Sequence, residues 1–486
     1  MLFHTSAFLV FFLTVFALHW WVVKRSVRWQ NVLLLLASYF FYGCWDWRFV
    51  ALLLFSTLLD YYTGIQIGST ENDHKRKTWL WISVGINVGL LGVFKYYDFF
   101  ALSLADLMAS LGYKVDVVTL ELILPVGISF YTFHGLSYVL DIYHRRIEPD
   151  RNLVDYALFV SYFPLLVAGP IERATHLLPQ LKVSRIFNYS SAVIGLRLIL
   201  WGVFKKVVIA DSCGMYVDFA HEHVFELSGS SLFIAAVLFS FQIYGDFSGY
   251  SDMALGVSRL FGIQLIENFK APYFSSSLSE FWSRWHISLT NWFRDYIYIP
   301  LGGNKGGFFI ASRNILIIFL LSGFWHGANW TFILWGFLNA LLILVERWLS
   351  KNMLSDAIKQ RTSLLTLLAA PMRIGFVFFI VTLLWVLFRS ENIYVAFSYV
   401  RGIFNSDLLM FPSLTQFASL TIQPVFLMVM LLVFFFFEFL GREKSYTLEF
   451  LEGLKCRFIR FLIYYILIMS TFFNPSVTET FIYFQF

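Results

Sequence analysis

The chain has 486 residues, of which 58% are hydrophobic, 20% are aromatic and only 14% are charged. A soluble chain would carry about a quarter charged residues, whereas several apolar runs here reach the roughly 20 residues that cross a bilayer. The composition excludes an ordinary soluble domain and predicts a polytopic membrane protein. The net charge of +5 is scattered among loops and gives no case for binding nucleic acid.

The first part of the chain contains five apolar runs, and basic clusters follow the first, third and fifth of them. The runs are residues 8–23, 32–44, 49–67, 79–94 and 120–140, and the basic clusters are 24–28, 71–77 and 144–146. If each run crosses once, the three clusters share one side, which the positive-inside rule identifies as cytoplasmic. The first run has no signal-peptide cleavage site and is expected to remain as a span, with the N-terminus in the periplasm.

The later apolar runs are less regular. Residues 157–168 are short and predict a bent or re-entrant piece, while 231–260 is expected to be broken at 245–252 by two glycines and two aspartates. Residues 310–344 are too long for one crossing and need a break. The remaining runs are 189–210, which carries Arg197, Lys205 and Lys206, then 374–388, 425–439 and 458–473.

These patterns predict an all-α membrane fold with about eleven transmembrane helices, together with re-entrant and interfacial helices. Broken helices with polar residues at membrane depth are tolerated where they line protein or a water-filled cavity. No polar stretch is long enough to fold alone, so we expect one membrane domain over residues 1–486. Its catalytic core would lie at about 231–348 and its C-terminal tail at 474–486.

Two histidines flanked by tryptophan are the residues on which we build a mechanism. His326 lies in the apolar run 310–344, and an imidazole in hydrocarbon is a functional candidate because it is costly there. A neutral imidazole can take a proton from a hydroxyl, which makes His326 a candidate general base. Its neighbours Gly323 and Gly327 would admit another backbone or a thin substrate. The alternative is a structural histidine bonded to a neighbouring helix.

The second histidine, His286, lies about forty residues upstream in an aromatic, amphipathic segment. Its rings, at 281, 282, 285, 292 and 293, suit an interfacial helix, so His286 could equally be an interfacial residue. The cations nearby would face the cytoplasm, where the phosphates of an anionic cofactor could dock. We assign cofactor binding to Arg284, Asn291, Arg294 and Lys305.

Other motifs carry less information. The glycine-rich loop 302–307 lacks the spacing of a phosphate loop, and 245–252 lacks the register of a serine-hydrolase elbow. Asp246 and Asp252 are expected to hydrogen-bond broken helices, with an ion site as the alternative. The three cysteines have no metal-ligand spacing, and no metal is expected. In the tail, Tyr483 could receive or relay an acyl group; otherwise it is a packing residue.

Several motifs together resemble the membrane-bound O-acyltransferases, and within them the bacterial alginate O-acetyltransferase branch, which also includes peptidoglycan and cellulose acetylation proteins. The likeness covers nearly the whole chain. The residues that carry it are 281–292, 296–303 and 322–328, with further agreement at 125–133, 167–171, 246–252 and 481–486.

The resemblance implies helices around a funnel that leads from the cytoplasm to a central pore. It implies His326 as the catalytic histidine, His286 as its partner and acetyl-CoA as the donor. A periplasmic SGNH-type transferase would then place the acetyl group on a polysaccharide, with alginate favoured, at the bacterial inner membrane. The oxyanion donor could be Asn291, Asn329 or a backbone N–H at a helix break.

Two other classes of function remain open from the sequence. A transporter or flippase of a glycan or acyl carrier would also explain broken helices with buried polar groups, although we find no internal repeat of the kind that many transporters contain. A scaffold subunit with an inert histidine is the third possibility. Thioester turnover that depends on His326 distinguishes an enzyme from both.

Overall fold

The computed structural model describes residues 1–486 except 24–25, 168, 354–363, 410–421, 475–480 and 483–486. The described residues form helices and loops without a β-strand. Seven of these helices are long and apolar enough to cross a membrane. The prediction of an all-α polytopic fold is confirmed, whereas the number of about eleven crossings stays a prediction.

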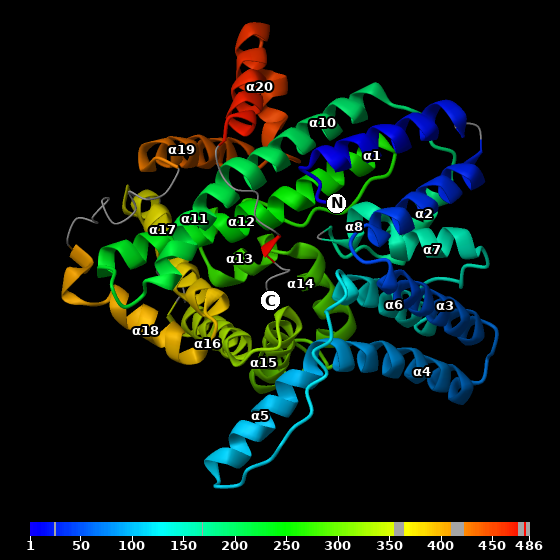
Figure 1. Ribbon diagram of the computed structural model, residues 1–486, viewed down its shortest axis with the longest axis horizontal. Helices are drawn as coiled ribbons and strands as arrows, with labels where there is room; N and C mark the ends of the chain where they lie inside the picture. Colours follow the sequence, from blue (N-terminus) through cyan, green and yellow to red (C-terminus); the bar gives the residue numbers. More distant parts are fainter. Residues whose placement is uncertain (24–25, 168, 354–363, 410–421, 475–480, 483–486) are drawn as a thin grey trace. The chain divides into compact units, whose positions relative to one another are not determined.

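The chain separates into two compact units, and the first comprises Met1–Leu196 and Ala254–Ile266. Its helices α3, α4 and α6 pack against one another and lie side by side in Figure 1. Its elements are α1 (Ser6–Ala17), η1 (Leu18–Val22), α2 (Val27–Gly43), α3 (Arg48–Gly68), α4 (Asp73–Leu91), η2 (Gly92–Tyr96), α5 (Tyr97–Ser110), α6 (Ile128–Tyr143), α7 (Leu153–Ser161), α8 (Phe163–Leu166), α9 (Ala174–Leu181) and most of α10 (Tyr189–Val203).

Polar contacts hold this helix packing together. The buried Asp60 of α3 accepts hydrogen bonds from Ser83 and Asn87 of α4, at 2.6 and 2.8 Å. Such contacts suit helices in lipid, where polar side chains bond across helices.

The run at 120–140 is helical only from Ile128, which corrects its predicted start. The bend predicted within 157–168 is confirmed, because α7 ends at Ser161 and α8 begins at Phe163.

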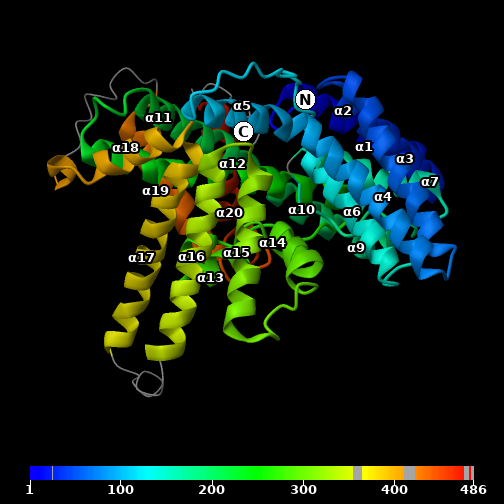
Figure 2. The same cartoon turned by 90° about the horizontal axis from the view of Figure 1, so that it is seen from below.

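The second unit comprises Arg197–Met253 and Glu267–Phe486. Figure 2 shows its helices α15, α16 and α17 running side by side. Its elements are the end of α10, η3 (Phe204–Ala210), α11 (Asp211–Glu222), most of α12 (Gly229–Leu260), η4 (Pro272–Phe274), α13 (Leu278–Arg284), α14 (Ile287–Phe293), η5 (Arg294–Tyr298), α15 (Gly307–His326), α16 (Trp330–Met353), α17 (Leu364–Arg389), α18 (Ile393–Ile403), η6 (Ser406–Leu409), α19 (Pro424–Gly441), η8 (Thr447–Gly453) and α20 (Arg457–Phe472).

The predicted break of 310–344 is confirmed, because α15 ends at His326 and α16 begins at Trp330. The break predicted at 245–252 is wrong, because α12 runs without interruption through these residues. Its two glycines serve close packing instead: a Cβ at Gly245 would lie 2.9 Å from the Lys205 carbonyl oxygen, and one at Gly249 would lie 2.7 Å from that of Gly202. Small residues let neighbouring backbones approach in this way.

The aromatic segment 281–293 forms two short helices, α13 and α14, whose rings are mostly buried in the second unit, and its location at the membrane interface stays a prediction. Phe281 and Trp285 are each 1% exposed, and Trp292 and Phe293 are also buried. Trp285 stacks on Phe281 at 5.6 Å between ring centroids and contacts Trp385 of α17 at 4.9 Å. The amphipathic pattern therefore reflects packing inside the unit, because the apolar rings face neighbouring helices.

The turn between α15 and α16 depends on a close backbone crossing. A Cβ at Gly323 would overlap the carbonyl oxygen of Phe332, and one at Gly336 would overlap that of Phe319. Helix packing of this kind tolerates no added methyl without a backbone shift.

We predict that Gly323→Ala lowers the free energy of unfolding by about 1–3 kcal/mol, as overpacking does. Thermal unfolding of the detergent-solubilised protein measures the change. Gly375→Ala on α17 is the matched control, because a Cβ there meets nothing within 4 Å. Equal unfolding temperatures for the two variants would contradict the crossing.

Candidate functional site

His286 connects the short helices α13 and α14 in a conformation that few residues adopt. Its backbone has φ 44° and ψ 53°, in the left-handed region that is strained for a residue with a Cβ. Its side chain is only 2% exposed. Strain of this kind persists where the surrounding structure imposes it, and it clusters at functional sites.

Asn268 fixes the tautomer of the His286 ring. The Asn268 Oδ1 atom accepts hydrogen bonds from the Ser288 backbone N–H at 3.2 Å and from the Ser288 hydroxyl at 2.8 Å. Since a backbone N–H can only donate, this Asn268 atom is an acceptor, and His286 Nδ1, 3.0 Å away, must donate to it. The proton therefore lies on Nδ1, and Nε2 carries a lone pair.

The lone pair of His286 is available for chemistry. Its Nε2 is buried and forms no hydrogen bond with the part of the chain that the structure describes. Burial lowers the pKa of His286 to about 3, so the ring is neutral at physiological pH. A neutral imidazole with a fixed tautomer and an open Nε2 can accept a hydrogen bond or a proton from a hydroxyl.

His326 is the last residue of α15 and is 5% exposed. Aromatic rings surround it, with centroids 5.3 Å away for Trp335 of α16 and 5.2 Å for Phe388 of α17. The carbonyl groups at a helix C-terminus carry partial negative charge and favour a nearby cation by about 0.3–1 kcal/mol. The His326 ring therefore lies next to the partial negative charge at the end of α15.

One indole joins the two histidines. The Trp325 ring contacts His326 at 5.0 Å and His286 at 5.9 Å between centroids. The structure thus brings together the two motifs that the sequence analysis singled out. Both imidazoles lie in the second unit, in an environment from which most water is excluded.

A buried charge cluster lies on α12 and the elements beside it. Lys206 Nζ pairs with Asp211 at 2.7 Å and with Asp246 at 2.9 Å, and each of these side chains is at most 3% exposed. Lys205 pairs with Asp252 at 2.7 Å. The two aspartates were predicted to hydrogen-bond broken helices, but α12 is continuous, and they pair with the lysines of η3 instead. Removing one member of such a cluster strands an uncompensated charge.

The C-terminal tail docks on this charge cluster. The Ile482 backbone N–H donates to Asp246 Oδ2 at 2.6 Å, and Phe481 is fully buried. The Phe247 ring contacts Phe481 at 5.9 Å and His286 at 4.7 Å. A single phenylalanine therefore separates the described end of the tail from the His286 imidazole.

The residues assigned to cofactor binding have their own partners or face solvent. Arg284 pairs with Glu280 at 2.9 Å, and Arg294 with Asp295 at 2.8 Å. Lys305 is exposed in the loop before α15, and Asn291 is half-buried on α14. The described contacts join none of the four to either imidazole. The proposed oxyanion donor Asn329 caps α16 through the Thr331 N–H, and Tyr483 lies outside the described residues.

Sequence reasoning missed the residues that orient the histidines. Asn268 precedes His286 by 18 positions in a polar stretch that has no recognisable motif, and Phe247 and Trp335 lie in apolar runs among many similar rings. Only their packing identifies them. Among the described residues, no group of three or more His, Cys, Asp or Glu side chains could hold a metal ion.

The sequence is similar to a family of membrane acyltransferases over the region that contains this site. The model of MBOAT, the membrane-bound O-acyltransferase family, matches residues 145–388, which include both histidines. The chain is 40% identical to the probable alginate O-acetylase AlgI of Pseudomonas putida, over 82% of the chain and 79% of that protein. It is 36% identical to the peptidoglycan O-acetyltransferase of Helicobacter pylori, over 83% of the chain and 79% of that protein.

The chain is less similar to a relative whose name describes the transfer of a D-alanyl group. The chain is 28% identical to the teichoic acid D-alanyltransferase of Bacillus subtilis, over 48% of the chain and 62% of that protein. The names of these relatives share the transfer of a small acyl group and differ in the polymer.

We predict that Asn268→Ala destabilises the protein more than Ser288→Ala. The first variant removes the acceptor of several buried donors, each of which costs about 1–3 kcal/mol when left unsatisfied, whereas the second removes one donor together with its hydrogen bond. Thermal unfolding in the same detergent ranks the two. The reverse order, or no change in either variant, would contradict the assigned hydrogen bonds.

Proposed function

The chain belongs to the membrane-bound O-acyltransferase family, and from this premise we propose that it is a membrane O-acetyltransferase. It takes acetyl groups from acetyl-CoA at the cytoplasmic face of the bacterial inner membrane and passes them to a periplasmic partner of the SGNH type. That partner modifies a polysaccharide, with alginate favoured by the similarity to alginate O-acetylases. The observation that carries the proposal is the pair of buried imidazoles in contact with one indole.

His326 acts as the general base in this proposal. It takes the proton of an acceptor hydroxyl, whose oxygen forms a bond to the acetyl carbonyl carbon as the carbon–sulfur bond breaks. The CoA thiolate leaves and takes up the proton from the imidazolium, so the base is regenerated. The dipole of α15 stabilises the transient cation at its C-terminus.

His286 is the partner of the base. Its Nδ1–H is held by Asn268, so its Nε2 can only accept. The acceptor hydroxyl has a single proton, which His326 takes, so His286 Nε2 accepts from a second donor group of the bound reactants. Holding the reactants in place lowers the barrier without further chemistry. The neutral ring also avoids repulsion with the imidazolium of His326.

Donor binding is assigned to Arg284, Asn291, Arg294 and Lys305. Arg284, Arg294 and Lys305 are exposed or half-buried, so their charged groups can contact the phosphates of a CoA molecule that binds from solvent. Arg294 is exposed and pairs with its neighbour Asp295, whereas the Arg284–Glu280 pair is partly buried. An exposed pair contributes little, so Arg294 can exchange its partner for a phosphate most readily. The oxyanion donor is assigned to Asn291 or to a backbone N–H at the break after His326, since the Asn329 side chain caps α16.

We predict that His326→Ala lowers CoA release from acetyl-CoA by about 10²–10⁴-fold, as loss of a general base does. The purified protein in nanodiscs is supplied with labelled acetyl-CoA, and free thiol is followed with and without the periplasmic partner. His74→Ala is the matched control, because His74 is exposed in the first unit. Release that is indifferent to His326 would overturn the mechanism and favour a transporter without covalent chemistry.

We further predict that Tyr483→Phe stops acetyl transfer to the partner while CoA binding persists. The docking of Phe481 and Ile482 beside Phe247 supports a tail that reaches the site, and Tyr483 carries the only strong nucleophile at its end. Tyr465→Phe, on the exposed face of α20, is the control. Mass spectrometry of the transferred label measures the effect, and unchanged transfer would leave Tyr483 as a packing residue.

A further inference from the structure

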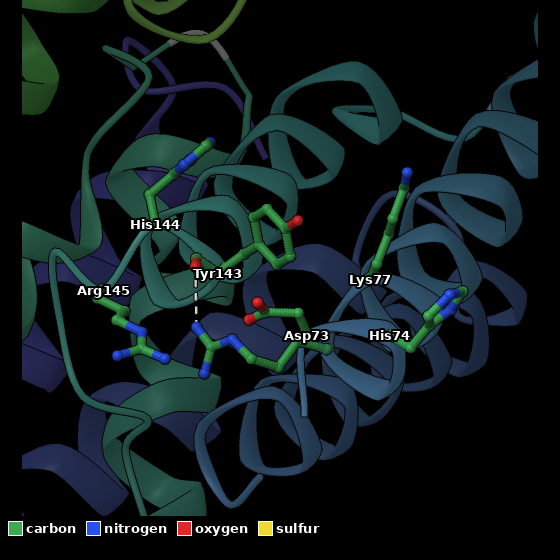
Figure 3. A pocket seen from close by; sticks show the side chains of 7 residues that line it. Asp73, His74, Lys77, Tyr143, His144 and Arg145 are labelled. Carbon is green, nitrogen blue, oxygen red and sulfur yellow. Dashed lines mark hydrogen bonds between the residues drawn. The ribbon is translucent and has the colours of Figure 1, made fainter. Parts of the chain in front are cut away.

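A basic pocket of about 420 Å³ lies in the first unit, where the first turns of α4 meet the end of α6. Figure 3 shows His144 and Arg145 at the end of α6 and Lys77 and His74 on α4, with Tyr143 and Asp73 between the two pairs in this view. Its lining also includes Arg76, so three formal positive charges stand against one negative charge. The pocket therefore attracts an anion.

The arginine at the base of the pocket is already used by the fold. Arg76 is buried and donates to the carbonyl oxygens of Ile67 at 2.8 Å and Tyr143 at 2.8 Å, which ties the ends of α3 and α6 to α4. It contributes charge to the pocket from a fixed position. The cations left to bind a ligand are the exposed ones, Lys77 and Arg145.

Two rim cations are available for this purpose. Lys77 is exposed and has no ion-pair partner in the described chain. Arg145 pairs with Glu71 at 2.8 Å, but both side chains are largely exposed, at 61% and 87%. An exposed pair contributes about 0–1 kcal/mol, so Arg145 can exchange Glu71 for a phosphate at little cost.

The location of the pocket indicates which kind of phosphate-containing molecule could bind there. It lies where two helices with membrane-spanning hydropathy end, namely Arg48–Gly68 and the helical stretch Asp73–Ser110. The basic clusters that border it are those that the positive-inside pattern assigns to the cytoplasmic face. Anionic lipid headgroups are found at this depth, and each nearby cation attracts them by about 1 kcal/mol.

The outward face of α4 continues from the pocket as an apolar strip. At 100° per residue, Lys77, Trp81, Gly85 and Val88 share one side of the helix. Trp81 is 60% exposed and Val88 52% exposed, while a Cβ at Gly85 would meet nothing within 4 Å. Along α4, the cation Lys77 comes first, then Trp81, a residue type common at the membrane–water interface, and then the shallow apolar surface at Gly85 and Val88.

We propose that this pocket and strip bind a glycerophospholipid, with the phosphate between Lys77 and Arg145 and an acyl chain along α4. A headgroup with a hydroxyl or ammonium beyond its phosphate also donates to Asp73, whose carboxylate lines the same pocket. The charges of Lys77, Arg145 and Asp73 favour a particular headgroup. The apolar strip of α4 favours an intact lipid over a free phosphate, because only a lipid has an acyl chain to place there.

The test is a lipid titration of the full chain, delipidated in detergent and followed by native mass spectrometry. The probe is phosphatidylglycerol of defined chain length, and the variant is Lys77→Ala with Arg145→Ala. We expect affinity to fall about tenfold or more. Lys75→Ala with Lys114→Ala is the control, because it removes two exposed charges outside the pocket and is expected to bind like the parent chain.

Two further probes separate the sources of the phosphate. Diacylglycerol tests the chains alone and glycerol phosphate tests the headgroup alone, and both are expected to bind far more weakly than the intact lipid. Equal affinity for either probe, or an equal loss in the control, would overturn the proposal. Lys77→Arg with Arg145→Lys keeps both charges, so it is expected to retain binding even if the double alanine variant unfolds.

Discussion

Each polar group inside this apolar protein needs a partner, and that requirement shapes its functional part. A buried donor or acceptor without a partner costs about 1–3 kcal/mol, and a buried unpaired charge costs more. Asn268 meets the requirement for His286 and Ser288, while Lys206 meets it for Asp211 and Asp246. These bonds leave the buried His286 Nε2, in the ring that contacts the Trp325 indole, without a hydrogen bond to the described part of the chain.

The same requirement relates the tail to the proposed chemistry. Asp246 is shared between Lys206 and the backbone of Ile482, so the tail completes a buried cluster rather than covering a surface. Phe247 follows Asp246 in sequence and contacts both Phe481 and His286. Adjacent residues of α12, Asp246 and Phe247, thus contact both the tail and the His286 ring.

The sequence predicted the features that depend on composition and local pattern. An apolar run of 35 residues cannot cross once, so the break near His326 followed from bilayer thickness alone. The two Trp–His motifs identified both imidazoles. The continuity of α12 could not be predicted in this way, because Gly245 and Gly249 destabilise an isolated helix but are favoured where backbones pack closely.

The sequence also did not predict which side chains surround the aromatic segment and the histidines. The aromatic segment 281–293 has the amphipathic pattern of an interfacial helix, yet the same pattern fits a short helix inside a helical bundle. Which one forms depends on whether partners such as Trp385 are present, a contact about 100 residues away in the chain. Asn268 has no sequence signature because its role arises from an αL turn at His286.

The relatives suggest how one membrane chemistry can supply different polymers. Their names include alginate, peptidoglycan and teichoic acid acyltransferases. If the membrane component performs the thioester step and a partner selects the glycan, the imidazole site stays the same while the acceptor changes. The polymer is then a property of the partner that is present with this chain.

In the proposed function, the acetyl group crosses the membrane through the histidine site. Sealed vesicles that hold the oriented protein, with the periplasmic partner and its glycan inside, would receive labelled acetyl-CoA on the cytoplasmic face only. We expect base-labile ester label inside the vesicles for the parent chain and none for a His326→Asn variant of equal stability. Ester label that stays on the donor side, or that forms equally in the variant, would contradict it.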